Sequence, residues 1–140
     1  MDGYLVDGPV DPGLIGDIIA EAGKMTGCGG HNIFLGQVRD DISGDKRVVS
    51  IEYSAYEMMV RQEADKIISE VSGGFADVKK VKILHSTGVV NAGEISLFVM
   101  VSAGHRGQAI EACRVTVEKI KERLPVWKRE IFSDSSHRWK

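Results

Sequence analysis

The sequence has 140 residues, of which 43% are hydrophobic, and its formal net charge at pH 7 is −2. These values predict one folded domain over residues 1–140, and they exclude a disordered chain, a fibre and a generally basic nucleic-acid-binding protein. No apolar run approaches the roughly 20 residues that cross a bilayer, so we expect neither a membrane nor nucleic acid as a partner. Two cysteines are too few for a disulfide framework, and the N-terminus lacks the features of a signal peptide, which favours a cytoplasmic protein.

Strand-like and helix-like segments are mixed along the chain. Apolar periodicity and turn residues predict, in chain order, a helix over 14–22, strands over 31–39 and 47–56, a helix over 57–71, strands over 78–85 and 94–102, a helix over 106–124 and a strand over 126–132. We expect a polar loop over 40–45 and a turn-rich link around Gly88, and Pro125 ends the third helix. Because the order has no regular strand–helix–strand rhythm, we expect an α+β fold with a mostly antiparallel sheet and a long helix in the C-terminal half.

Lys121 stands out in the predicted helix over 106–124. At about 100° per residue, an apolar stripe that includes Ile110, Cys113 and Ile120 forms one side of this helix, and most charged residues lie on the other. Lys121 projects beside the apolar stripe. Burial disfavours the charged form of a lysine and lowers its pKa, which frees the amine to act as a nucleophile or base. The alternative is a lysine at the core boundary whose ammonium stays in water.

The corner over residues 102–106, Ser-Ala-Gly-His-Arg, lies between a predicted strand and this helix. The free N–H groups of a helix N-terminus bind anions, and His105 and Arg106 add cationic side chains at the same place. This arrangement predicts a phosphate or carboxylate site, whereas the alternative is a His and an Arg on an exposed turn. Arg39 and Lys128 are further cations near the ends of elements, and together these residues favour an anionic small molecule.

The charge is unevenly distributed along the chain. Residues 1–102 carry a formal charge of −6, and residues 103–140 carry +4. Strand alternation puts Lys128 and Arg129 on opposite faces, and we expect Trp127 beside them to lie in the core. The basic C-terminal part therefore contains most of the candidate site residues.

Several familiar kinds of site are missing from the sequence. Its glycines fit no phosphate-binding loop, and no Ser–His–Asp arrangement is recognisable. The four histidines, at positions 31, 85, 105 and 137, lack the spacing of metal ligands and are expected in the core or on the surface. Cys28 and Cys113 are expected to be small buried residues rather than nucleophiles. We therefore expect neither a metal nor a cofactor.

Three segments carry a family resemblance. They are Phe34-Leu35-Gly36-Gln37-Val38-Arg39, Ser102-Ala103-Gly104-His105-Arg106 and Lys121-Glu122-Arg123-Leu124-Pro125-Val126-Trp127-Lys128-Arg129-Glu130. In order and spacing they resemble the large, catalytic subunit of molybdopterin synthase, the MoaE family. The likeness covers about residues 28–139, and the run ending in Trp-Lys-Arg-Glu is its most specific part.

The resemblance implies an α/β-hammerhead-like fold and a sulfurtransferase activity. Members of this family add two sulfurs to cyclic pyranopterin monophosphate and so form the dithiolene of molybdopterin for the molybdenum cofactor. The sulfur arrives as a thiocarboxylate on the C-terminal Gly-Gly of a small ubiquitin-like subunit, whose tail enters a pocket of the large subunit. The implied assembly is a heterotetramer around a dimer of large subunits, and both large subunits contribute to each pocket.

Carried over position by position, the resemblance implies two catalytic lysines, Lys121 and Lys128. It implies substrate-binding roles for Gln37, Val38, Arg39, His105, Arg106, Arg129 and Glu130. His105 and Arg106 are implied to reach the pocket from the neighbouring subunit. Some members of the family have a lysine in place of Gln37, and many have a bulkier residue in place of Gly104. An alternative of another class is a non-catalytic dimeric module that binds a phosphorylated metabolite through Arg39, His105 and Arg106.

Overall fold

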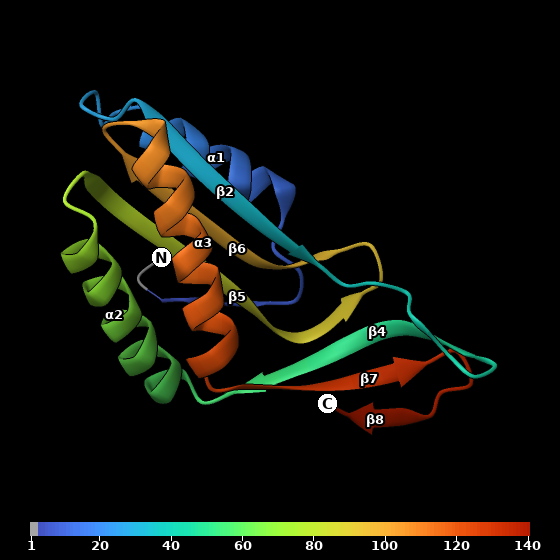
Figure 1. Cartoon of the computed structure of the whole chain (residues 1–140). Helices are drawn as coiled ribbons and strands as arrows, with labels where there is room; N and C mark the ends of the chain where they lie inside the picture. Colours follow the sequence, from blue (N-terminus) through green and yellow to red (C-terminus); the bar gives the residue numbers. More distant parts are fainter. Residues whose placement is uncertain (1–2) are drawn as a thin grey trace.

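The computed structural model describes residues 3–140, so the expectation about the N-terminus falls partly outside the described residues. The elements follow in the order β1 (Leu5–Asp7), α1 (Pro12–Ala22), β2 (Gly30–Gln37), β3 (Ile42–Ser43), β4 (Lys46–Ala55), α2 (Glu57–Gly74), β5 (Val78–Asn91), β6 (Ile95–Ala103), α3 (Arg106–Arg123), β7 (Val126–Phe132) and β8 (His137–Trp139) (Figure 1). None of the described helices is both long enough and apolar enough to span a membrane.

The strands form one sheet in the order β2-β6-β5-β4-β7-β8, with β1 paired to β5 and β3 paired to β4. The β1–β5 pair is parallel and the other pairs are antiparallel. The long strand β5 joins two parts of the sheet, because residues 78–85 pair with β6 and residues 88–91 pair with β4. In Figure 1, β4, β7 and β8 project beyond the part of the sheet that the helices cover. This architecture confirms the predicted α+β fold with a mostly antiparallel sheet.

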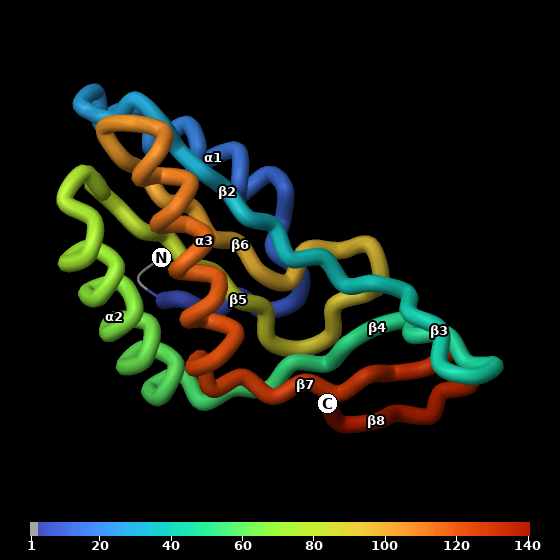
Figure 2. Tube along the Cα trace, viewed as in Figure 1, coloured from blue at the N-terminus to red at the C-terminus, as the bar shows by residue number. Residues whose placement is uncertain are grey.

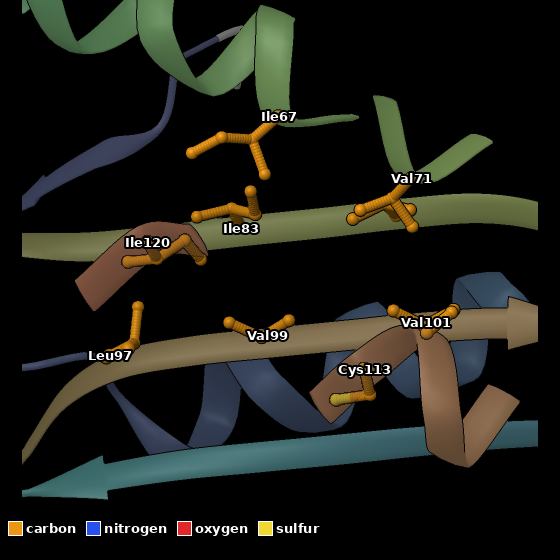
Figure 3. Packing of buried hydrophobic residues seen from close by; sticks show 10 residues of the cluster. Ile67, Val71, Ile83, Leu97, Val99, Val101, Cys113 and Ile120 are labelled. Atoms are coloured by element: carbon orange, nitrogen blue, oxygen red, sulfur yellow. The ribbon is translucent and has the colours of Figure 1, made fainter. Parts of the chain in front are cut away.

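Apolar layers cover both sides of β5 and β6. Helices α2 and α3 bury their apolar faces on one side, around Ile67, Ile83 and Val99 (Figure 3). Helix α1 covers the opposite side, where Leu84 and Phe98 lie. Successive strand residues point to opposite sides, and both sides of β6 are covered. The strand is therefore apolar along most of its length. This packing fixes the position of both ends of α3 relative to the sheet.

A smaller cluster forms the core of the projecting part of the sheet. Its buried residues come from the segment after β2 and from β4, β5 and β7: Val38, Val48, Ile51, Tyr53, Val90 and Phe132. The cluster packs the end of β2 close to β4 and β7. Three segments that are distant in the sequence are thereby brought together near the C-terminal end of α3.

The structure corrects the turn-rich link that was expected after residue 85. Strand β5 continues to Asn91 through Gly88, which has a φ of +79°. A left-handed conformation is readily available only to glycine, and a Cβ here would lie 3.1 Å from a carboxylate oxygen of Asp7. The end of β5 is ordered by pairing with β4, a long-range contact that local sequence does not reveal.

Other boundaries also differ from the predictions. Strand β2 ends at Gln37, so Arg39 follows the strand instead of ending it. The polar segment over 40–45 contains β3, which Figure 2 shows beside β4. Strand β8 was missed because its residues are polar or aromatic and all are exposed. Trp127 is 46% exposed instead of lying in the core, because it is on the open face of β7.

Candidate functional site

Two adjoining cavities lie where the C-terminal end of α3 meets β4 and β7. The larger, of about 350 Å³, is termed the wide chamber, and the smaller, of about 110 Å³, is termed the narrow chamber. The residues that line both chambers are Tyr53, Ser96, Lys121 and Lys128. The wide chamber is further lined by residues 34–39 and by Asp41, Ile51, Glu130 and Lys140, and the narrow chamber by His85, Ile120, Leu124 and Val126.

The turn from α3 into β7 brings the two candidate catalytic lysines together. Lys121 lies in the last turn of α3, Pro125 follows the end of the helix, and Lys128 lies on β7. Lys128 faces Tyr53 across the β4–β7 ladder. Because Lys121 and Lys128 line both chambers, two amines from different elements meet at the boundary between them.

The two lysines differ in burial, and the difference corrects the expectation from the helix pattern. Lys121 is exposed, because it lies in the last turn of α3 beyond the buried Ile120, whereas Lys128 is partly buried. Burial is the largest cause that lowers the pKa of Lys128, and the charges of Lys121 and Lys140 lower it further. Glu130 acts in the opposite direction. The lowered pKa expected of a partly buried lysine is thus found at Lys128.

Buried polar side chains lie beside the lysines. The hydroxyl of Tyr53 donates to Ser96 Oγ over 3.1 Å, and Ser96 Oγ donates to the carbonyl oxygen of Gly36 over 3.4 Å. Burial raises the pKa of Tyr53, although its hydrogen bond to Ser96 acts in the opposite direction, so the phenol stays protonated. The ring of His85 packs edge-on against Tyr53, with 5.1 Å between centroids. Sequence reasoning did not identify these site residues, because they come from three different strands.

The segment after β2 forms one wall of the wide chamber. Gln37 and Arg39 are exposed, and Arg39 pairs with Asp41 over 3.2 Å. Val38 is buried, and both its N–H and its carbonyl oxygen bond to the backbone of the turn between β5 and β6. Gln37 and Arg39 can therefore contact a substrate directly, whereas Val38 holds the wall in place.

Arg129 lies on the other face of β7 and lines neither chamber. Its guanidinium pairs with Glu52 and stacks over the ring of Trp139, 5.3 Å from the centroid. Strand alternation causes this placement, because Lys128 and Glu130 on either side of it face the chambers. The side chain of Arg129 thus holds β4, β7 and β8 together, and the substrate-binding role that the resemblance implies for it stays a prediction.

Glu130 is buried at the wide chamber, with 3% of its surface exposed. Its carboxylate accepts a hydrogen bond from Arg138 over 2.9 Å and pairs with Lys140 over 3.6 Å. Burial would raise the pKa of Glu130, but the hydrogen bond from Arg138 and the charge of Lys140 outweigh it and lower the pKa. Glu130 therefore anchors β8 and places the Lys140 ammonium beside the wide chamber.

This arrangement predicts that β8 is sensitive to acid. Because the folded-state pKa of Glu130 lies below its ordinary value of 4.5, its stabilising effect is complete above that value and is lost as the pH falls through the folded pKa. We expect the fluorescence of Trp139, measured in a Trp127→Phe background, to change only when the pH falls below the ordinary Glu value of 4.5. Glu130→Gln should show the low-pH signal already at pH 7, whereas Glu122→Gln on the exposed face of α3 should not. Identical titrations of the parent and Glu130→Gln would contradict this anchoring role.

His105 and Arg106 lie at the opposite end of α3 from the chambers. The backbone N–H of His105 donates to Asp77 over 2.7 Å, and its Nδ1 lies 3.1 Å from the same carboxylate oxygen. Arg106 is exposed, and its backbone lies beside Gly30 at the start of β2. The sixteen steps along the chain from His105 to Lys121 span about 24 Å at the rise of an α-helix. One chain therefore does not bring this pair of residues to its own chambers.

Glycine at position 104 shapes the corner before α3. A Cβ on Gly104 would clash with the carboxylate of Asp77, so glycine at this position permits the contact that holds His105.

The side chains that usually bind metal ions do not gather into a site in the part of the chain that the structure describes. Over residues 3–140, no group of three or more His, Cys, Asp or Glu side chains is placed to hold a metal ion. Cys113 is buried and Cys28 is partly buried.

Comparison with known proteins identifies the family. The model of the family described as MoaE protein matches residues 7–123. The chain belongs to the MoaE family. It is 35% identical over 137 residues to the molybdopterin synthase catalytic subunit of Drosophila melanogaster, an alignment that covers 97% of this chain and 36% of that relative. This MoaE-family chain thus spans about a third of the length of the curated relatives that it matches.

Solved structures support the assignment to the MoaE family. The molybdopterin synthase structure from Staphylococcus aureus matches with a TM-score of 0.85 and 27% identity, covering all of this chain and 97% of that one. A complex of subunits 1 and 2 of the molybdopterin-converting factor from Helicobacter pylori 26695 matches with a TM-score of 0.82 over 97% of this chain and 88% of that one. At 20% identity the second match shows a shared fold alone.

Proposed function

We propose that this chain is the catalytic subunit of a molybdopterin synthase, a cytoplasmic sulfurtransferase of molybdenum cofactor biosynthesis. Its substrate is cyclic pyranopterin monophosphate, and its sulfur donor is the C-terminal thiocarboxylate of a small ubiquitin-like subunit. The observation that carries the proposal is the meeting of Lys121 and Lys128 between two chambers of a MoaE-family fold. The free cysteines agree with a reducing compartment.

The two chambers suit the two substrates. The narrow chamber has three apolar residues on its walls and about 110 Å³ of space, which suits an unbranched tail of glycines. The wide chamber carries Arg39 and Lys140 in addition to the shared lysines, and these cations can pair with a phosphate. Lys121 and Lys128 then lie between the thiocarboxylate and the pterin.

The proposed chemistry uses these lysines at the reacting carbonyl and at the phosphate. The thiocarboxylate sulfur attacks a side-chain carbon of the pterin that carries the cyclic phosphate, the C–O bond there breaks with the phosphate oxygen taking the electron pair, and a thioester joins the tail to the pterin. Water then adds to the carbonyl carbon, so the tail leaves as a carboxylate and the sulfur stays on the pterin. Lys121 contacts the carbonyl or moves a proton there, while Lys128 and Arg39 stabilise charge as the cyclic phosphate ester opens.

A second copy of the chain completes the proposed site. His105 and Arg106 lie about 24 Å from Lys121 along α3, and β2 spans a similar distance, since the seven steps from Gly30 to Gln37 extend about 24 Å. Arg106 lies beside Gly30 at one end of β2, and the chambers lie beside Gln37 at the other. Antiparallel pairing of two β2 strands about a central two-fold axis therefore puts each Arg106 next to the chambers of the other copy.

The outer edge of β2 is suited to this pairing. Strand β2 lies at one end of the sheet and, among the described strands, pairs only with β6. Phe34 and Leu35 on β2 and Ile110 on the adjacent α3 are exposed. The exposure of Ile110 corrects its expected place on the buried stripe, and a dimer would cover this apolar surface. We propose this dimer as the centre of a heterotetramer with two small subunits.

Reconstitution tests the proposed function. We expect the purified chain to convert cyclic pyranopterin monophosphate to molybdopterin when the thiocarboxylated small subunit is supplied, and to form no product with the ordinary carboxylate form of that subunit. The alternative, a non-catalytic module that binds a phosphorylated metabolite, predicts binding of the pterin without turnover. Retained binding of both substrates with no molybdopterin formed would refute the proposed enzyme.

A further inference from the structure

His85 is a buried polar residue of the narrow chamber for which the proposed chemistry has no role. It lies on β5, is 8% exposed, and lines the chamber together with Lys121 and Lys128. Its ring is fixed on one side by the edge-on contact with Tyr53. Tyr53 in turn is the register partner of Lys128 across the β4–β7 ladder, so the strand position beside the imidazole is also the one opposite this lysine.

The hydrogen bonding of His85 determines its tautomer. Nδ1 lies 2.8 Å from the backbone carbonyl oxygen of Ser86. A carbonyl oxygen only accepts hydrogen bonds, so Nδ1 carries the proton and Nε2 presents a lone pair. Among the described residues, no other hydrogen bond to the ring is formed, which leaves Nε2 available to a donor in the chamber.

The surroundings keep this imidazole neutral. Burial, the largest cause, together with the charges of Lys121 and Lys128 lowers the pKa of His85 to about 4, although the hydrogen bond to Ser86 acts in the opposite direction. At neutral pH the ring is therefore an uncharged acceptor rather than a third cation. Its weak basicity also excludes it as the group that takes a proton from a lysine ammonium.

Among the charged groups around Lys128, none supplies such an acceptor in the narrow chamber. Most charges around Lys128 are positive and come from several elements: Lys121 on α3, Arg39 after β2 and Lys140 after β8. The negative one, Glu130, lines only the wide chamber and is engaged by Arg138 and Lys140.

We propose that His85 is a positioning residue whose Nε2 accepts a hydrogen bond from the Lys128 ammonium and holds it at the boundary between the two chambers. The inference rests on the proposed function for its catalytic meaning, but the proposed contact needs no substrate and is therefore tested in the unliganded protein. A hydrogen bond to the ammonium favours its charged form and partly offsets the burial and like charges that act on Lys128. His85 thereby sets both the place and the protonation of this lysine.

Two substitutions separate the acceptor from the rest of the imidazole. In His85→Gln, the side-chain oxygen can replace Nε2, whereas His85→Asn keeps a donor for the Ser86 carbonyl but no acceptor that reaches the chamber. Lys128 ionisation is measured in the unliganded protein by competitive acetylation across pH, read by peptide mass spectrometry. We expect its midpoint to fall by about one pH unit in His85→Asn and to stay in place in His85→Gln and in the control His31→Asn. An unchanged midpoint in His85→Asn overturns the inference.

A second measurement does not depend on the folding of any His85 variant. We expect the ¹⁵N signal of His85 Nε2 to shift when the donor is removed in Lys128→Met and to keep its position in Lys119→Met, whose lysine pairs with Glu70. An unchanged ¹⁵N chemical shift of His85 Nε2 in Lys128→Met refutes the contact. In the reconstituted complex, His85→Asn should lower kcat about 10-fold with little change in KM for the pterin.

The acetylation and NMR measurements use the unliganded protein, so they test the contact between His85 and Lys128 even if no molybdopterin forms. Failure of the proposed function would therefore be distinguished from failure of this inference.

Discussion

Lys121→Ala is expected to lower the rate of molybdopterin formation by about 10²- to 10⁴-fold, the effect of removing a group that transfers protons in the transition state. Because the side chain of Lys121 is exposed, truncating it removes an amine from both chambers without removing core packing. The variant should therefore keep its melting temperature and its binding of the small subunit. Single-turnover reconstitution, thermal denaturation and subunit binding on one preparation measure these three properties.

Lys119→Ala is the matched control for this prediction. Lys119 lies two residues earlier on α3, and its ammonium pairs with Glu70 over 2.8 Å. We expect this variant to keep full activity. Lys121→Arg distinguishes two roles, because a guanidinium keeps the positive charge but does not give up its proton. Substantial activity in Lys121→Arg indicates an electrostatic role, and full activity in Lys121→Ala removes Lys121 from the mechanism.

Mixing two inactive variants is expected to restore about a quarter of wild-type activity, because the proposed site is shared between two copies. In a heterodimer of Lys121→Ala and Arg106→Ala chains, one site carries both defects. The other site takes Lys121 from one chain and Arg106 from the other, and both are intact. Random reassociation makes about half of the dimers heterodimers, each with one active site of two. The measurement is activity against mixing ratio after dissociation and reassociation, with a maximum at equal amounts.

Ile110→Asp provides the control for this experiment, because Ile110 is exposed on α3 beside β2 and lines neither chamber. A carboxylate on this apolar surface opposes packing against a second copy, so adding it to both chains should prevent the recovery. If Lys121 and Arg106 served the same chain's site, every chain would carry one defect and no mixture would recover activity. That outcome would refute the two-fold arrangement while leaving the role of Lys121 open to the first experiment.

The turn from α3 into β7 could be predicted from sequence because its signals are local. Pro125 ends the helix, and period-2 alternation puts Lys128 and Arg129 on opposite faces of the following strand, as the structure confirms. The elementary geometry of a strand therefore predicts where the side chain of Arg129 lies, on the face away from the chambers.

The rest of the site depends on contacts between distant segments. His85, Tyr53 and Ser96 come from β5, β4 and β6, and no local pattern predicts that their side chains meet. Strand β5 extends past residue 85 because β4 offers a partner there. The angular position of Lys121 around the axis of α3 likewise predicts the direction of its side chain but not its exposure. The exposure depends on how far the last turn of α3 extends beyond the sheet on which the helix packs.

Among the described strands, none pairs with the outer edge of β2, so a single chain carries this edge open. An open strand edge with exposed Phe34 and Leu35 is a template for pairing with any other free strand, and so a hazard for aggregation. Dimer formation would remove this hazard in the same step that assembles the proposed site. Substitutions along β2 are therefore expected to reduce the yield of protein from cells as well as its activity.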